Sequence, residues 1–314
     1  MTKFQNTLTR SYTFSGKGLH TGKISTITIN PAAPDTGIRF LRTDLGPGAF
    51  VDALAENVSS TARSTTVSCG DASVMTIEHL LSAMTGLDVD NVLVEIDGPE
   101  VPILDGSAKP YITEIAPDGV AVQDKERKYI DIDREFSLTN EKGAKVVISP
   151  ADDFSYDIKI DFNSRVMGVQ TAHWDSAVDY KTQIGVCRTF VFFHEIEFLL
   201  KNNLIKGGDV DNALVIVEHP VSEEQVRTIA ESIGRPALRV ADNGYLTNAE
   251  LRFENECARH KLLDLIGDLR LCGGFLKAKV TAEKAGHTIN TAIAKEVRKY
   301  LLDNVGRRCM LLDR

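Results

Sequence analysis

Hydrophobic and polar positions alternate along this chain with two different periods, which predicts a mixed α and β protein. A period of two at residues 25–29 and 92–96 is typical of strands that bury one face. Helical spacing runs through residues 76–84 and 255–271. Glycine and proline are dense in the first half, which indicates many short strands joined by turns.

The length of the chain predicts two domains, because 314 residues is about twice the usual size of one domain. We place the boundary within residues 116–128, where APDGVAVQDKERK combines a turn with a run of charges before a predicted strand at 129–133. The prediction is an N-terminal α+β domain at residues 1–126 and a C-terminal α+β domain at residues 127–314.

The composition is that of a soluble globular protein, with 43% hydrophobic and 25% charged residues. A net charge of -8 argues against a nucleic-acid partner. Five cysteines without CxxC spacing fit free thiols in a reducing compartment. The polar start has no signal-peptide core and no apolar run is long enough for a transmembrane segment, so we expect a cytoplasmic protein.

The first candidate for chemistry is the pair His260 and Asp264, which lie one turn apart on one face of the predicted helix. Taken alone, this spacing is more often a surface ion pair. The helix is mostly apolar, however, so the carboxylates of Asp264 and Asp268 need partners. A divalent cation and a histidine beside Asp268 would supply them. A hydrolytic zinc site takes three protein ligands, and His79 is the candidate for the third.

Further candidates lie at the starts of two predicted helices. Thr76 is the expected N-cap of the first, which places Glu78 and His79 in its first turn. The helix dipole there favours an ionised Glu78 as general base and a neutral, ligating His79, with a solvated glutamate and a capping histidine as the alternative. His287 stands in a turn before the last helix and is a candidate general acid, with a merely solvated histidine as the alternative.

Aromatic residues concentrate in one segment, at Phe190, Phe192, Phe193 and Phe198. A packed core explains such a group, and a wall for an alkyl chain is the alternative. The dipeptide His194-Glu195 does not begin an HExxH motif, because Phe198 holds the second ligand position. This argues against a metallopeptidase of that class.

Several motifs follow one another in a specific order: Thr-Ile-Glu-His-Leu at 76–80, Arg-Thr-Phe at 188–190, Arg-His-Lys-Leu-Leu-Asp at 259–264 and Gly-His at 286–287. Together they resemble the UDP-3-O-acyl-N-acetylglucosamine deacetylase family. Gly-Leu-His-Thr-Gly at 18–22 and Val-Pro-Ile-Leu-Asp-Gly-Ser-Ala at 101–108 strengthen the resemblance, which extends from about residue 8 to residue 302.

The resemblance implies a zinc-dependent deacetylase, in which Fe2+ fits the same ligands. It implies removal of the N-acetyl group from a UDP-sugar that bears a 3-hydroxyacyl chain, the committed step of lipid A synthesis in Gram-negative bacteria. The implied metal ligands are His79, His260 and Asp264, and the implied general base is Glu78.

The resemblance also assigns roles around these ligands. His287 is the implied general acid, with Asp268 orienting it, and Thr189 steadies the oxyanion. Lys261 and Phe162 are implied to bind the substrate, Phe162 by meeting the uracil ring.

The implied fold has two domains of similar topology, each a sheet layered with helices, with helices packed between the two sheets. Residues 190–217 correspond to an inserted βαβ unit that forms an acyl passage, which favours the wall interpretation for Phe190 and Phe192. Some bacteria fuse this enzyme to an acyl-carrier-protein dehydratase, so that activity is the expected partner. Residues 218–243 receive no role.

Overall fold

The first half of the chain builds a five-stranded sheet. The computed structural model describes residues 2–196, 212–232, 238–247 and 250–312. In spatial order the strands are β2 (Tyr12–Lys17), β3 (Ile24–Pro31), β9 (Val92–Ile96), β4 (Ile38–Arg42) and β5 (Phe50–Asp52). Ile27 and Ile29 are fully buried while the threonines between and before them are half-buried, so the period of two predicted this strand correctly.

The second half repeats this arrangement. Its sheet has the order β12 (Phe136–Thr139), β13 (Lys145–Pro150), β18 (Leu276–Glu283), β14 (Ser155–Asp161) and β15 (Val169–Asp175). In both sheets the third and fourth strands pair in parallel and the other neighbours pair antiparallel. The expected similarity of topology is therefore confirmed. The strand predicted at 129–133 is only β11 (Ile130–Asp131), which pairs with β18.

Smaller elements complete the first half. A three-stranded sheet contains β6 (Val58–Ser60), β7 (Thr66–Cys69) and β8 (Ala72–Val74), and short 3-10 turns lie at η1 (Thr43–Leu45), η2 (Ala55–Asn57) and η3 (Ala116–Asp118). The turn expected near residue 116 is present, but the charged run after it is strand β10 (Val120–Glu126), paired with β1 (Phe4–Leu8). Local pattern missed it because the partner lies at the other end of this half. The domain boundary itself stays a prediction.

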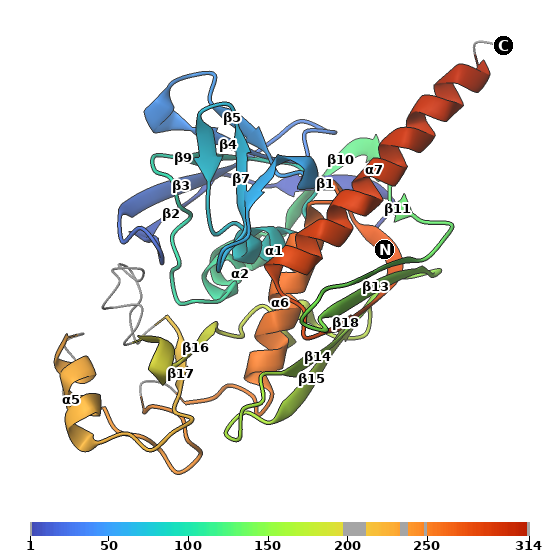
Figure 1. Cartoon of the computed structure of the whole chain (residues 1–314). Coiled ribbons are helices and arrows are strands. Elements are labelled where there is room, and N and C mark those ends of the chain that lie inside the picture. Colours follow the sequence, from blue (N-terminus) through green and yellow to red (C-terminus); the bar gives the residue numbers. More distant parts are fainter. Residues whose placement is uncertain (1, 197–211, 233–237, 248–249, 313–314) are drawn as a thin grey trace.

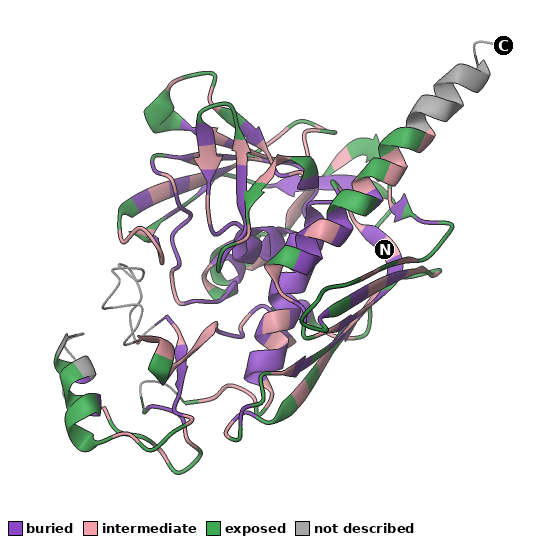
Figure 2. Ribbon diagram, viewed as in Figure 1, coloured by how far each residue is buried: buried purple, intermediate pink, exposed green. Residues whose placement is uncertain are grey.

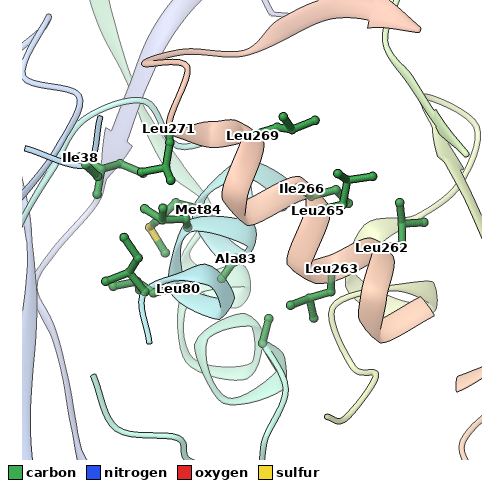
Figure 3. Close-up of a cluster of buried hydrophobic side chains, with 14 of the residues drawn as sticks. Ile38, Leu80, Ala83, Met84, Leu262, Leu263, Leu265, Ile266, Leu269 and Leu271 are labelled. Atoms are coloured by element: carbon green, nitrogen blue, oxygen red, sulfur yellow. The ribbon is translucent and has the colours of Figure 1, made fainter. Parts of the chain in front are cut away.

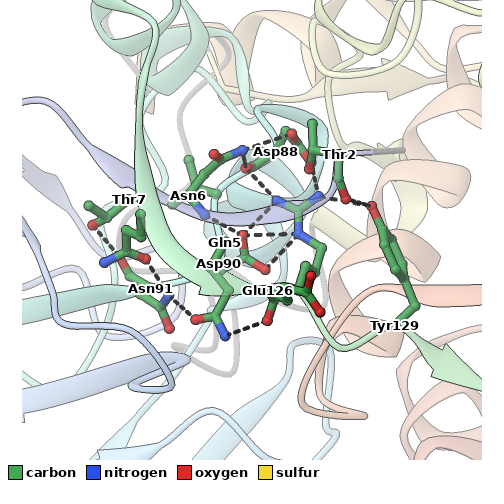
Figure 4. Close-up of polar contacts among 12 residues, drawn as sticks. Thr2, Gln5, Asn6, Thr7, Asp88, Asp90, Asn91, Glu126 and Tyr129 are labelled. Atoms are coloured by element: carbon green, nitrogen blue, oxygen red, sulfur yellow. Dashed lines mark hydrogen bonds and ion pairs between the residues drawn. The ribbon is translucent and has the colours of Figure 1, made fainter.

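Buried polar contacts fasten β1 to the loop that precedes β9 (Figure 4). The Asn6 backbone N–H donates to Asp90 Oδ2 at 2.6 Å, and the Thr7 hydroxyl donates to the Asn91 carbonyl at 2.6 Å. Arg127 Nη2 donates to the same Asp90 oxygen at 2.6 Å. One carboxylate thus joins the first strand to the point where the chain enters its second half.

Helices α1 (Glu78–Gly86) and α6 (Glu256–Arg270) cross between the two sheets (Figure 1). Both are buried over almost their whole length (Figure 2). Their apolar side chains form one cluster (Figure 3), which includes Leu80, Met84, Leu262, Leu263, Leu265, Ile266 and Leu269. Burying one such side chain stabilises the fold by about 2 kcal/mol. A Cβ built on Gly267 would overlap the Glu78 carbonyl oxygen, so only glycine allows this close crossing.

The remaining helices are α2 (Lys109–Ile115), α3 (Tyr180–Gln183), α5 (Glu223–Ser232) and α7 (His287–Leu312). Strands β16 (Phe190–Phe192) and β17 (Leu214–Ile216) pair in parallel, as the expected insert requires. Its connecting segment falls at residues 197–211, outside the described residues, as does Phe198. Helix α5 lies within residues 218–243 and buries Val226 and Ala230. Among the helices that the structure describes, none has the length and apolar character needed to cross a bilayer.

Candidate metal centre and catalytic site

The crossing of α1 and α6 brings His79, His260 and Asp264 together. One ligand atom from each lies within 4.8 Å of the others, and all three residues are buried. The Nε2 atoms of His79 and His260 lie 3.4 and 3.5 Å from Asp264 Oδ1. The three predicted metal ligands, one from α1 and two from α6, therefore face the same position.

The hydrogen bonds around these residues leave their facing atoms free for a cation. His260 Nδ1–H donates to the Cys187 carbonyl at 3.1 Å, since a carbonyl only accepts, and this leaves a lone pair on Nε2. Asp264 Oδ2 accepts a hydrogen bond from Lys261 Nζ at 2.8 Å. Asp264 Oδ1 is buried and has no hydrogen-bond partner among the described residues. A buried oxygen that faces imidazole lone pairs fits a metal ion placed between them.

Electrostatics keep this donor set in its ligating form. Burial lowers the pKa of His260 to about 3, so its imidazole is neutral at pH 7. Although burial opposes ionisation, the Lys261 ammonium is the largest attraction that holds the pKa of Asp264 well below its usual range. Two neutral imidazoles and one carboxylate are the protein ligands of a hydrolytic zinc site that keeps a further position open.

Glu78 and His287 form a second pair beside the donor set. His287 Nε2 lies 3.8 Å from Glu78 Oε1, while Glu78 Oε2 accepts from the Thr65 N–H at 3.0 Å. Burial raises the pKa of Glu78. Burial alone would lower the pKa of His287, but the carboxylates of Asp268 and Glu78 raise it to about 9. The pair therefore offers a proton acceptor and a proton donor within one enclosed space.

Asp268 holds His287 in place. His287 Nδ1–H donates to Asp268 Oδ2 at 2.9 Å, and Asn290 Nδ2 donates to the same oxygen at 2.9 Å. The Thr65 hydroxyl donates to Asp268 Oδ1 at 2.6 Å. The sequence predicted a histidine beside Asp268, but it carried no signal for Thr65. Asn290 stands three residues after His287 on the same helix, which is a signal that helical spacing could have used.

The expected N-cap role of Thr76 is wrong. Helix α1 begins at Glu78, its N-cap is Ile77, and no side chain caps it. Thr76 has a φ of 59°, and its hydroxyl donates to Glu100 Oε1 at 2.9 Å. The Thr76 hydroxyl therefore bonds to the buried Glu100 carboxylate instead of capping the helix. Glu78 and His79 still lie in the first turn.

A cavity of about 470 Å3 connects these groups. Every predicted site residue except Asp268 lines it, and the lining also includes His20 and Arg63, to which the sequence assigned no role. Larger hollows of about 980 and 580 Å3 lie elsewhere, but the three candidate ligands line neither.

One wall of this cavity is aromatic. The ring centroid of Phe162 lies 5.4 Å from that of Phe190 and 5.9 Å from that of Phe192. Phe190 also packs edge-on near His260, with 6.5 Å between ring centroids, and Lys261 Nζ lies 5.7 Å from the Phe190 centroid. Phe162 lines the cavity and is itself 44% exposed. Phe190 and Phe192 thus line the cavity, whereas Phe193 packs in a small separate core.

Comparison with known proteins gives one consistent match. A family model described as UDP-3-O-acyl N-acetylglycosamine deacetylase, LpxC, matches residues 5–238 and 229–299. A relative named "Bifunctional enzyme LpxC/FabZ" from Porphyromonas gingivalis is 42% identical over 301 residues, which cover 96% of this chain and 65% of the relative. A protein of the same name from Chlorobaculum tepidum is 41% identical over 94% of this chain and 64% of the relative.

A shorter relative shares a similar identity. The UDP-3-O-acyl-N-acetylglucosamine deacetylase of Geobacter sp. is 39% identical over 300 residues, which cover 94% of this chain and 89% of the relative. The chain thus spans slightly under two thirds of each bifunctional relative and most of the shorter one.

Proposed function

The chain belongs to the UDP-3-O-acyl N-acetylglycosamine deacetylase family, and on that premise we propose that it is a metal-dependent amide hydrolase. Its substrate is UDP-3-O-(3-hydroxyacyl)-N-acetylglucosamine, and its products are acetate and the free amino sugar, in the committed step of lipid A biosynthesis. One observation carries the proposal. The donor set of His79, His260 and Asp264 opens into the same buried cavity as the pair Glu78 and His287.

The metal in this proposal is zinc, held by His79, His260 and Asp264. Fe2+ is a second candidate, because imidazole and carboxylate ligands suit both ions. A zinc ion in such a site supplies a Lewis acid that polarises the acyl oxygen and lowers the pKa of water to about 7. The unpartnered Oδ1 of Asp264 is the feature of this chain that supports a metal there.

The side chains perform the proton transfers. Glu78 accepts a proton as a water oxygen adds to the acetamide carbonyl carbon, and its raised pKa brings it closer to neutral pH. The hydroxyl of Thr189, a residue that lines the cavity, donates a hydrogen bond to the carbonyl oxygen as that oxygen gains negative charge. His287 then gives a proton to the amide nitrogen, the C–N bond breaks, and Asp268 keeps the imidazole aligned.

Substrate binding uses the remainder of the cavity wall. Phe190 and Phe192 line the space for the acyl chain, and Phe162 offers a partly exposed face to the uracil ring. Lys261 Nζ lies 2.8 Å from Asp264 Oδ2, beside the proposed metal ligands, and attracts the anionic nucleotide-sugar. The net charge of -8 does not oppose this, because residues 252–284 contain seven Lys and Arg against five Asp and Glu.

The bifunctional names of two relatives support a partnership with the acyl-carrier-protein dehydratase expected from the sequence. We propose that this chain works beside such an activity in the cytoplasm.

The test is acetate release from the UDP-sugar combined with elemental analysis of the purified protein. We expect turnover and one zinc ion per chain, with the metal lost in His79→Ala and Asp264→Ala. His173→Ala is the matched control, because His173 is a histidine on the exposed face of β15. A wild-type chain that binds the UDP-sugar but holds no metal and releases no acetate would be a nucleotide-sugar or lipid-binding protein instead.

A further inference from the structure

Glu100 is a buried carboxylate that serves two segments of the catalytic cavity. Its residue is 1% exposed. Oε1 accepts from the His20 N–H at 2.9 Å and from the Thr76 hydroxyl at 2.9 Å, and Oε2 accepts from the Thr21 N–H at 2.8 Å. These three donors satisfy the buried carboxylate oxygens.

The first segment that Glu100 holds is the loop at residues 18–21. This loop follows β2 and presents Leu19 and His20 to the cavity. A Cβ built on Gly18 would overlap the Glu100 carboxylate, so the loop backbone packs directly against it. The His20 Nε2 atom is buried without a hydrogen-bond partner among the described residues. The position of this wall therefore depends on the Glu100 contacts with the loop backbone.

The second segment is the turn that leads into α1. Thr76 has left-handed backbone geometry, which is rare for a β-branched residue and persists only where the surroundings fix it. Glu100 holds its side chain, and backbone bonds at Met75 on either side tie the turn to the same segment: Met75 N–H to the Pro99 carbonyl at 2.9 Å and Val101 N–H to the Met75 carbonyl at 3.0 Å. Two residues later the chain reaches Glu78 and His79.

We propose that Glu100 is a positioning residue that fixes the 18–21 loop and the 75–77 turn relative to each other. It thereby sets the placement of Glu78 and His79 at the start of α1 against the opposite cavity wall. The expected change in kcat rests on the proposed function. The expected changes in the two segments and in metal affinity do not depend on that function.

Glu100→Gln tests this proposal with little change in shape. The amide group places an N–H2 against either the Thr21 N–H or the donors at His20 and Thr76, so the clamp loses at least one bond. The matched control is Glu95→Gln on β9, where a half-buried glutamate accepts from Asn30 Nδ2 at 3.1 Å and does not line the cavity.

Three measurements separate positioning from general stability. The first is Co2+ affinity and the visible absorption spectrum of the Co2+ complex, with the metal alone as probe. The second is amide hydrogen exchange at residues 18–21 and 75–79, and the third is kcat and KM for deacetylation. We expect Glu100→Gln to weaken Co2+ binding about 10-fold, to change the spectrum, and to speed exchange in both segments. We also expect kcat to fall about 10- to 100-fold with a smaller change in KM, while Glu95→Gln matches the wild type.

The proposal is overturned if folded Glu100→Gln keeps the wild-type Co2+ affinity and spectrum, even if its melting temperature falls. If Glu100→Gln does not fold, Thr76→Val decides. It removes one of the three donors and keeps the side-chain shape, and an unchanged spectrum and exchange rate there would also overturn the proposal. A wild-type chain without deacetylase activity would refute the proposed function, and the Co2+ and exchange comparisons would still test Glu100.

Discussion

His287 Nε2 lies 3.8 Å from Glu78 Oε1, within a cavity lined by residues of α1, α6 and α7 and by an aromatic wall. The other imidazole nitrogen, Nδ1, donates to Asp268 at 2.9 Å, so two carboxylates favour the protonated, positively charged form of His287. Glu78 raises the pKa of His287, and His287 lowers the pKa of Glu78, so the proposed acid and base shift each other's pKa.

The first prediction concerns the charge of His287. Its pKa in the metal-free fold is about 9, above the ordinary value of 6.5, so the protonated form stabilises the fold fully below about pH 6.5 and that stabilisation is lost as the pH rises through about 9. Asp268→Asn removes the largest attraction and lowers this pKa. An NMR titration of the His287 imidazole in metal-free protein measures its pKa in the wild type and in Asp268→Asn. Equal values in these two proteins would contradict the assignment.

The same change shifts the activity profile. Turnover needs the protonated imidazole, so kcat of the wild type falls on the alkaline side, and this fall moves to lower pH in Asp268→Asn. His173→Ala serves as control, since His173 pairs with Asp157 and Asp175 and does not line the catalytic cavity.

The second prediction concerns the acid and the base themselves. Glu78→Ala and His287→Ala each lower kcat by about a hundred- to ten-thousand-fold, because each removes one proton transfer. Neither residue belongs to the donor set, so both variants retain one metal ion per chain by elemental analysis. Near-normal turnover in both metal-loaded variants would refute the roles given to them.

The third prediction concerns Gly267, where α6 passes the start of α1. Gly267→Ala forces the helices apart, because the added methyl group would overlap the Glu78 carbonyl. We expect a loss of about 1–3 kcal/mol in the free energy of unfolding, together with weaker metal binding. Gly48→Ala is the control, since nothing lies within 4 Å of a Cβ built there. Equal denaturation midpoints for the two variants would show that the crossing tolerates a side chain.

The fourth prediction concerns removal of the metal. Binding to the folded chain alone stabilises it by about 2.7 kcal/mol at a free metal concentration of 100 Kd. A chelator therefore lowers the melting temperature of the wild type but leaves that of His79→Ala unchanged. A chelator effect of the same size in His79→Ala would place the stabilising ion elsewhere.

Strong local patterns predicted the parts of the fold that pack along their whole length. Helix α6 lies within one residue of its predicted span at each end, because its apolar residues are buried almost all round, and the predicted strand at 92–96 coincides with β9. The pair His260 and Asp264 followed from spacing on that helix. His79 lies on another helix far away in the sequence, so spacing alone could not pair it with His260 and Asp264; the need for a third ligand, its place at a helix start and the family resemblance pointed to it.

Long-range contacts decided what the sequence could not predict. Thr76 has the chemistry of a cap, but the Glu100 carboxylate takes its hydroxyl. The charged sequence of β10 is typical of a linker, and only its pairing with β1 in the folded chain makes it a strand. Thr65 donates to both Glu78 and Asp268 from a loop whose local sequence shows no periodicity, so its role appears only in three dimensions.

The crossing of α1 and α6 also imposes an order on folding. His79 lies on α1 whereas His260 and Asp264 lie on α6, so the three candidate ligands come together only once these two helices pack against each other, and we expect tight metal binding to form late in assembly. Colour development from Co2+ during refolding would accordingly lag behind the recovery of helical and sheet signals in circular dichroism. Metal binding by these three residues would therefore report the moment at which the two ligand-bearing helices come together.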